Sequence, residues 1–109
     1  MSLTTDLWIA AYRVRLEAQG AFVHIARKGD VHAGAILIKV ATMDGRAILY
    51  QRSFDLMTGE RAWVVLCSGE ERAVDEAADK QASFDPDVWV VEVEDPKGRH
   101  LLDDPTLAL

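Results

Sequence analysis

Cysteine and histidine are scarce in this chain, and their scarcity limits what can hold the fold together. Of 109 residues, one is a cysteine, Cys67, and three are histidines, no two of them four residues apart. An intramolecular disulfide is therefore impossible, and neither a cysteine zinc site nor a helical two-histidine site has its ligands. We predict a fold that relies on its hydrophobic core, without a metal or other cofactor, in a reducing compartment.

Long apolar runs, repeats and linkers are also missing. No stretch is apolar over a length sufficient to span a bilayer, and residues 1–6 carry neither the basic nor the apolar part of a signal peptide. The three prolines all lie in the last quarter of the chain. We therefore expect one cytoplasmic domain over residues 1–109, not associated with a membrane. Its ordered core should span about 4–103, followed by a loose tail after Asp103.

Positive charge is in short supply in the second half of the chain. The net charge is −6, and residues 51–109 carry fourteen acidic side chains against six basic ones. Nucleic-acid binding rests on cations that neutralise phosphates, so this balance argues against it. Four basic residues lie near the start of the chain: Arg13, Arg15, Arg27 and Lys28. They do not guarantee a basic patch, because Arg13 and Arg15 point in different directions on the predicted helix. We expect no nucleic-acid partner.

Motifs for phosphate binding and for nucleophilic catalysis are absent as well. The sequence has no Walker A loop and no G-x-G-x-x-G, and no serine stands in a G-x-S-x-G context. The sequence thus assigns no catalytic, cofactor-binding or metal-binding residue outright.

What the chain does contain is apolar periodicity typical of short helices and strands. Helical spacing predicts a helix over residues 5–19, capped by Thr4 or Thr5. Alternating or wholly apolar patterns predict strands at residues 21–28, 34–41, 47–53, 61–67 and 88–94. Ser68 and Glu71 form a capping-box pattern, which predicts a second helix from there to about Ala82.

This order of elements, α-β-β-β-β-α-β, predicts an α+β fold. The close spacing of the first four strands, with Asp44-Gly45 as a hairpin turn, favours a mainly antiparallel five-stranded sheet. We expect both helices to pack on one face of this sheet. Because residues 34–41 and 61–67 are apolar on both sides, the other face would stay apolar. We expect a homodimer that forms through a sheet edge or this adjoining apolar face.

Two carboxylates on the last strand, Glu92 and Glu94, share one face of it. Paired carboxylates serve as acid and base in enzymes, or bind a hard cation. The simpler interpretation is that they lie at the solvated end of the strand and pair with Lys39 or Arg27 across the sheet.

Other candidates stand alone and also have two interpretations. Asp85 and Asp87 could join Asp95 in a cation site, or form the turn before the last strand. The histidines His24, His32 and His100 are each a possible base or ligand.

Two further residue types complete the candidates. Cys67 lies just before a predicted helix, where a thiol can become reactive, or it is a small buried apolar residue. The tryptophans Trp8, Trp63 and Trp89 either contact a ligand or partner, or fill the core; we expect at least two of them to be mostly buried.

Three stretches carry a family resemblance. They are residues 6–13 (DLWIAAYR), residues 34–40 (GAILIKV), and residues 84–95 (FDPDVWVVEVED) followed by Gly98-Arg99-His100. In order and spacing the chain resembles the small bacterial family called domain of unknown function 1491. The resemblance implies a stand-alone domain of about this length; it implies no activity and carries over no catalytic residue.

These observations support three functional hypotheses. The first is a non-catalytic protein-binding or assembly module, since no complete active-site constellation is visible. The second is a small metal-assisted or acid/base enzyme that uses Glu92, Glu94 and a histidine. The third is a small-ligand sensor with a tryptophan-lined pocket.

The charge distribution generates the first testable prediction. We expect no useful affinity for duplex DNA, because no predicted helix carries a row of lysines or arginines and the second half is acidic. A filter-binding titration at physiological salt measures this, and sub-micromolar binding would contradict it.

Overall fold

The computed structural model describes residues 3–107 and has the predicted order of elements. The helix α1 spans Thr5–Ala18 and α2 spans Glu71–Phe84. The strands are β1 (Phe22–Arg27), β2 (Ile36–Ala41), β3 (Arg46–Phe54), β4 (Arg61–Glu70) and β5 (Trp89–Glu94). A short 3-10 helix, η1, covers Pro105–Leu107.

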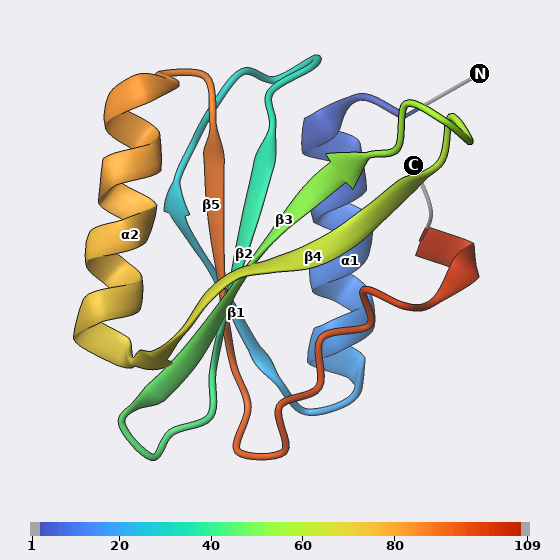
Figure 1. The fold of residues 1–109 in the computed structure, drawn as a ribbon. Helices are drawn as coiled ribbons and strands as arrows, with labels where there is room; N and C mark the ends of the chain where they lie inside the picture. Colours follow the sequence, from blue (N-terminus) through green and yellow to red (C-terminus); the bar gives the residue numbers. More distant parts are fainter. Residues whose placement is uncertain (1–2, 108–109) are drawn as a thin grey trace.

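The five strands form one mixed sheet in the order β1-β5-β2-β3-β4 (Figure 1). The pairs β1–β5, β2–β3 and β3–β4 are antiparallel, while β2–β5 is parallel. The prediction of a mainly antiparallel sheet therefore needs correction. A helical crossover returns the chain in the same direction, and α2 thus inserts β5 parallel to β2, between β2 and β1.

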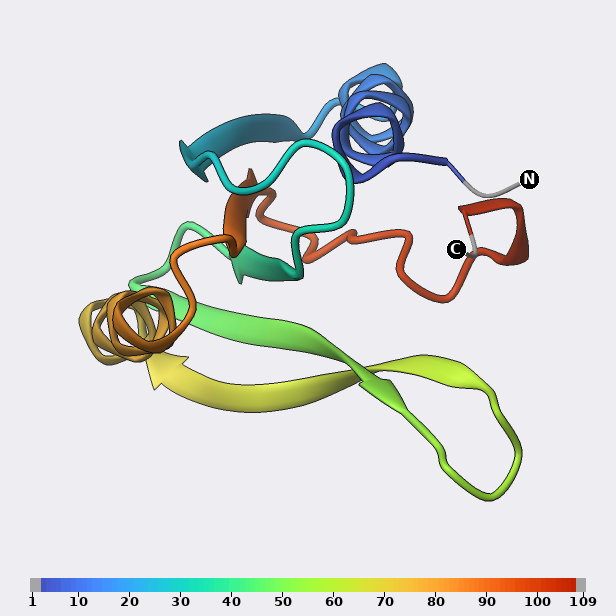
Figure 2. The same ribbon diagram turned by 90° about the horizontal axis from the view of Figure 1, so that it is seen from above.

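The two helices cover opposite faces of the sheet (Figure 2), so the prediction that both pack on one face is wrong. The reason lies in β2, whose six residues are all buried. Its residues Ile36, Ile38 and Val40 belong to the core cluster under α1. Leu37 and Ala41 belong to the cluster under α2. A strand that is apolar on both faces needs cover on both.

The cluster under α1 is the larger one. Helical spacing brings Trp8, Ile9, Tyr12 and Leu16 onto the strands β1, β5 and β2. Trp8 and Trp89 are 1% and 5% exposed, which confirms that at least two tryptophans are mostly buried. On the other face, Val74 and Ala78 of the alanine-rich α2 are buried against the sheet.

The second helix begins later than its capping-box pattern predicted. Strand β4 continues through Ser68 to Glu70, so Ser68 caps nothing, and the N-cap position falls on Glu70 without a side-chain cap hydrogen bond. Instead, the Glu71 N–H donates to the carbonyl oxygen of Gly45 at 2.9 Å. Pairing of β4 with β3 along the whole strand therefore stabilises this segment more than a helix cap at Ser68 would.

The predicted loose tail is ordered at least as far as Leu107. Leu107 is 8% exposed and packs in the cluster under α1, and its carbonyl oxygen accepts the Trp8 Nε1–H at 2.7 Å. Arg15 pairs with Asp104 at 3.1 Å and also contacts Thr106. A buried indole N–H requires an acceptor, and this segment supplies it. The predicted tail residues 108–109 lie outside the described residues.

In the described part of the chain, neither helix has the length and hydropathy needed to cross a membrane.

Docking of the C-terminal segment generates a stability prediction. Leu107→Ala should lower the free energy of unfolding by about 2–3 kcal/mol, the cost of removing a buried leucine side chain. Urea denaturation measures it. The matched control is Leu56→Ala, because Leu56 is 89% exposed and should change stability by roughly 0.5 kcal/mol or less. Equal effects of the two substitutions would contradict the docking.

Candidate ligand-binding cleft

The carboxylate Glu92 is held in an ion-pair cluster under α2. Lys39 on β2 is 3% exposed, and its Nζ lies 3.2 Å from Glu92, 2.8 Å from Glu71 and 2.5 Å from Asp75. Burial alone would lower the pKa of Lys39, but the hydrogen bonds that Lys39 donates to the three carboxylates outweigh it and raise the pKa. The cluster ties α2 to the two central strands. The interpretation of Glu92 as the ion-pair partner of Lys39 is confirmed.

The structure does not gather Glu94 and a histidine around Glu92 into a catalytic group. His24 lies opposite Glu92 in the β1–β5 register, but it is exposed. His32 lies in the loop before β2, and His100 lies beyond β5 on the α1 side. Within residues 3–107, no three His, Cys, Asp or Glu side chains are arranged to hold a metal.

The aspartates near β5 have local structural roles at its two ends. Asp85 ends α2, and its Oδ1 accepts the Asp87 N–H at 3.0 Å, which forms the turn into β5. Asp95 follows the other end of the strand, so the three do not meet. Cys67 is half-buried against the cluster under α2, four residues before the helix begins.

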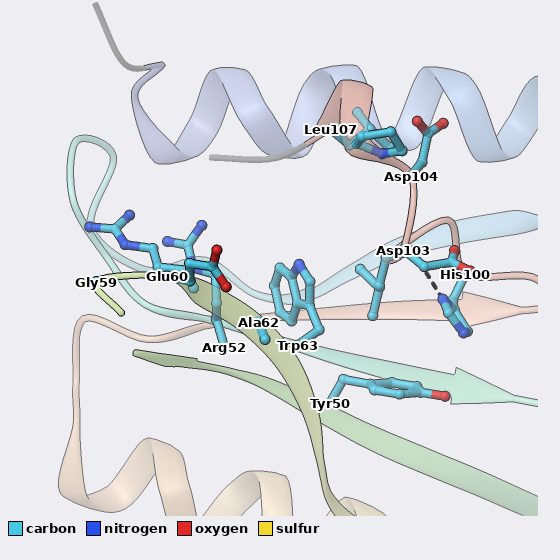
Figure 3. Close-up of a pocket in the computed structure, with 13 residues that line it drawn as sticks. Tyr50, Arg52, Gly59, Glu60, Ala62, Trp63, His100, Asp103, Asp104 and Leu107 are labelled. Atoms are coloured by element: carbon cyan, nitrogen blue, oxygen red, sulfur yellow. Dashed lines mark hydrogen bonds between the residues drawn. The ribbon is translucent and has the colours of Figure 1, made fainter. Parts of the chain in front are cut away.

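A different group of residues forms the main cavity of the molecule, a cleft of about 690 Å³ on the α1 side of the sheet. Its walls come from β3, from the β3–β4 loop with the start of β4, and from the segment 100–107 (Figure 3). Because α1 covers β1, β5 and β2, the same face of β3 and β4 is left to the C-terminal segment, which covers it only in part.

Cross-strand pairing places the cleft side chains of the hairpin on one face. Tyr50 is opposite Val65, and Arg52 is opposite Trp63. Trp63 stacks on Trp8 of α1 with ring centroids 5.7 Å apart, and Trp8 stacks in turn on Tyr12 at 4.9 Å. The stacked rings of Tyr12, Trp8 and Trp63 thus run from the buried side of α1 into the cleft.

His100 and Tyr50 lie at one end of the cleft, with ring centroids 5.0 Å apart. The His100 Nδ1 accepts the Leu102 N–H at 3.0 Å (Figure 3), so the neutral ring carries its proton on Nε2. The Tyr12 hydroxyl donates to the His100 carbonyl oxygen at 2.7 Å. Burial, with a contribution from Asp103, raises the pKa of Tyr50.

Arg52 lies at the other end, with its guanidinium carbon 5.8 Å from the centroid of the Trp63 ring. Its Nη1 is buried and has no hydrogen-bond partner among the described residues. No ion pair within residues 3–107 includes Arg52 or the neighbouring Arg61. Burial, and next the charge of Arg61, lower the pKa of Arg52. The cleft therefore contains a half-buried arginine that forms no ion pair within residues 3–107.

The outer wall of the cleft is fixed by Asp95, which is 1% exposed. Its carboxylate accepts the N–H groups of Lys97 and Arg99 at 3.1 and 3.0 Å, and binds the Arg99 guanidinium at 2.6 and 3.2 Å. The hydrogen bond from Arg99 is the main cause that lowers the pKa of Asp95 to about 2. Asp95 thereby sets the direction in which the chain leaves β5.

Sequence reasoning named Trp63 and His100 separately but missed Arg52 and the cleft itself. The signal was present as alternation, Tyr50 with Arg52 and Arg61 with Trp63, on two strands joined by a loop. Predicting the cleft from this alternation requires the β3–β4 register and the path of residues 100–107. No local sequence pattern provides either.

Comparison with known proteins identifies the family. The model of the family described as protein of unknown function DUF1491 matches residues 3–103. This chain is a DUF1491 protein. The predicted resemblance is thereby confirmed, and the family description assigns no activity. No curated protein matches the chain.

Solved DUF1491 structures have the same fold. A crystal structure of a DUF1491 protein from Caulobacter crescentus is 45% identical, with a TM-score of 0.87, over 95% of this chain and 98% of that one. An NMR structure of a DUF1491 protein from the same species has a TM-score of 0.83 at 45% identity, with 96% of each chain covered. A solution structure of an A. tumefaciens protein has a TM-score of 0.73 at 29% identity, with 86% of each chain covered.

The low pKa of Asp95 predicts how acid affects the outer wall. A carboxylate whose pKa is about 2 in the folded state, against an ordinary 3.8, stabilises the fold above pH 3.8. This contribution is lost as the pH falls from 3.8 through 2. Asp95→Asn should therefore be less stable at neutral pH, and its deficit should shrink below pH 3.8.

Urea denaturation at several pH values measures this deficit. Asp79→Asn, on the exposed side of α2, is the control and should behave like the unmodified protein. A deficit of Asp95→Asn that stays constant down to pH 2 would contradict the role of the ion pair.

Proposed function

We propose that this DUF1491 protein is a small-ligand-binding module that holds an organic anion in the cleft. The observation that carries the proposal is Arg52, whose buried Nη1 lacks an acceptor among residues 3–107 while the side chain borders an open cavity. An unpaired buried donor of a charged group costs free energy. A ligand oxyanion would remove that cost.

The chemistry of the guanidinium indicates the ligand group. Arginine presents several N–H donors in a planar fork that matches the two oxygens of a carboxylate or the oxygens of a phosphate. Arg61 lies on the neighbouring strand, and its charge acts on Arg52. Two adjacent cations favour an anion beside them. Glu60, at the Arg52 end of the cleft, disfavours a second anionic group (Figure 3).

The rest of the cleft favours a ligand with an apolar body. Trp63 and Leu102 line the cleft between its two ends. A cavity of about 690 Å³ falls in the range of roughly 300–1,000 Å³ that is typical of small-molecule sites. At the far end, the Nε2–H of neutral His100 is a donor that would suit a ligand hydroxyl or carbonyl. This proposal corresponds to the small-ligand sensor hypothesis drawn from the sequence, and it names the residues that would bind the ligand.

Binding is favoured over catalysis because Glu92, the carboxylate proposed with Glu94 for acid/base work, is engaged elsewhere. Glu92 is fixed by Lys39 on the opposite face of the sheet from the cleft. Within the cleft, His100 is the one histidine, and its Nδ1 is occupied by a backbone N–H. The single, unpaired Cys67 supports a cytoplasmic location.

A second candidate function is the protein-binding or assembly module. It is favoured by a specific surface: the β3–β4 hairpin projects from the body of the molecule (Figure 2) and exposes several large apolar side chains. These are Phe54, Leu56, Met57, Val64 and Val65. Exposed apolar groups in such a cluster mark interaction sites.

Calorimetric titration with four small probes tests the ligand proposal. Benzoate and phenyl phosphate combine an oxyanion with a ring, benzyl alcohol has the ring alone, and inorganic phosphate has the anion alone. We expect the two aryl anions to bind more tightly than the other two and to shift the NMR signal of the Trp63 indole N–H. Failure of both aryl anions to bind would overturn the proposal.

Arg52→Gln should weaken binding of the aryl anions by roughly 10- to 100-fold, the value of a hydrogen bond to a charged group. Arg52→Lys keeps the charge but loses the fork, so it should lie between. The control is Arg72→Gln on the exposed side of α2, which should bind as the unmodified protein does. If Arg52→Gln binds equally well, Arg52 does not hold the anion.

A further inference from the structure

We propose that β4 pairs with the β4 strand of a second copy of this chain, antiparallel, so that the two sheets become one. In this arrangement Arg61 of each copy lies opposite Glu70 of the other. The observations behind it are the exposed edge of β4 and the order of charges along that edge. They are independent of the cleft residue Arg52.

Apart from the β-bulge at Leu66 and one charge at each end, the edge strand β4 lacks the usual protection against pairing. It is the last strand of the sheet, ten residues long, and its sequence RAWVVLCSGE contains neither proline nor lysine. Its central residues Val64 and Val65 are 38% and 55% exposed. Soluble proteins normally shorten, charge or cover such an edge, since its free backbone groups are a template for another strand. The opposite edge, β1, is only six residues long.

A β-bulge at Leu66 determines which residues of β4 share a face. Leu49 is paired with Cys67 and Tyr50 with Val65, so Leu66 is the extra residue. Side chains of β3 alternate regularly, which places Arg46 and Phe54 on the same face. Their partners, Glu70 and Arg61 respectively, therefore share a face too. Without the bulge, two residues nine positions apart would point to opposite faces.

This shared face makes the edge self-complementary. A two-fold axis that sets Arg61 opposite Glu70 of the second copy also sets Trp63 opposite Ser68 and Val64 opposite Cys67. The two ends carry opposite charges, the centre is apolar, and no like charges face each other. Opposite charges across a strand pair are stabilising and like charges destabilising. The symmetry repeats the ion pair at both ends.

The pairing also accounts for two exposed features. It brings the apolar hairpin tip, with Leu56 and Met57, next to the start of α2 in the second copy. A two-fold axis perpendicular to the sheet places both clefts on one side, separated by the two β4 strands. Glu70 of the second copy then forms an ion pair with Arg61 at the rim of the cleft. Arg52 remains the cation inside the cleft.

Light scattering on the full chain, at increasing protein concentration, tests the dimer. We expect a mass of twice 12.1 kDa. A mass of one chain throughout would overturn the proposal, whatever the outcome of ligand titration. The Arg52 variants should keep the dimer mass, so the two proposals fail separately.

A charge exchange tests the register. Arg61→Glu sets two glutamates opposite each other, and Glu70→Arg sets two arginines opposite each other, so each alone should halve the mass. The double variant restores opposite charges and should restore the dimer. Lys28→Glu, at an exposed position just after β1, is the control and should stay dimeric, and circular dichroism confirms folding of each variant. Single variants that remain dimeric, or a double variant that remains monomeric, would contradict this register.

Discussion

Burial of the central strands on both faces is the constraint on which the rest of this structure depends. Every residue of β2 is buried, and β5 beside it has apolar side chains in both core clusters. Water can be excluded from both faces only if each carries a helix. This divides the two helices between the faces. It also places the one buried cation of β2, Lys39, under α2, where three carboxylates surround it.

The same division creates the cleft. One helix of fourteen residues covers three strands, and over β3 and β4 it contributes the stacking of Trp8 on Trp63 but no complete cover. The segment after β5 takes over this part of the face, held by Asp95 at its start and by the Trp8–Leu107 hydrogen bond near its end. Because the segment is narrow, Arg52 and Trp63 are covered on one side only, and a cavity remains beside them.

The cleft and the β4 edge meet in the β3–β4 hairpin. Its inner face supplies Arg52 to the cleft, and its outer strand supplies the self-complementary edge. Beyond the body of the sheet, a two-stranded ribbon has little core of its own and is marginally stable in water. A ligand against one face, or a second strand along the edge, would each stabilise it. The two proposals therefore concern one element, although separate residues carry them.

The sequence by itself determined the elements of this protein. Alternation and helical spacing predicted both helices and all five strands, because each signal lies within one segment. The double-sided apolar pattern of residues 34–41 corresponds to the central strand β2, whereas the same pattern at 61–67 belongs to the edge strand β4. For Glu92 the sequence left two partners open, Lys39 or Arg27, and the structure has Lys39.

Only the tertiary structure decided how these elements are combined. The parallel place of β5, the separation of the helices and the docking of Leu107 depend on contacts between distant segments, which local patterns do not encode. Ser68 illustrates this. Its sequence context fits a helix N-cap, but pairing of β4 with β3 stabilises the fold more than one cap would. The cleft arose likewise, because Arg52, Trp63 and His100 are neighbours only after the hairpin and the C-terminal segment have packed on the same face.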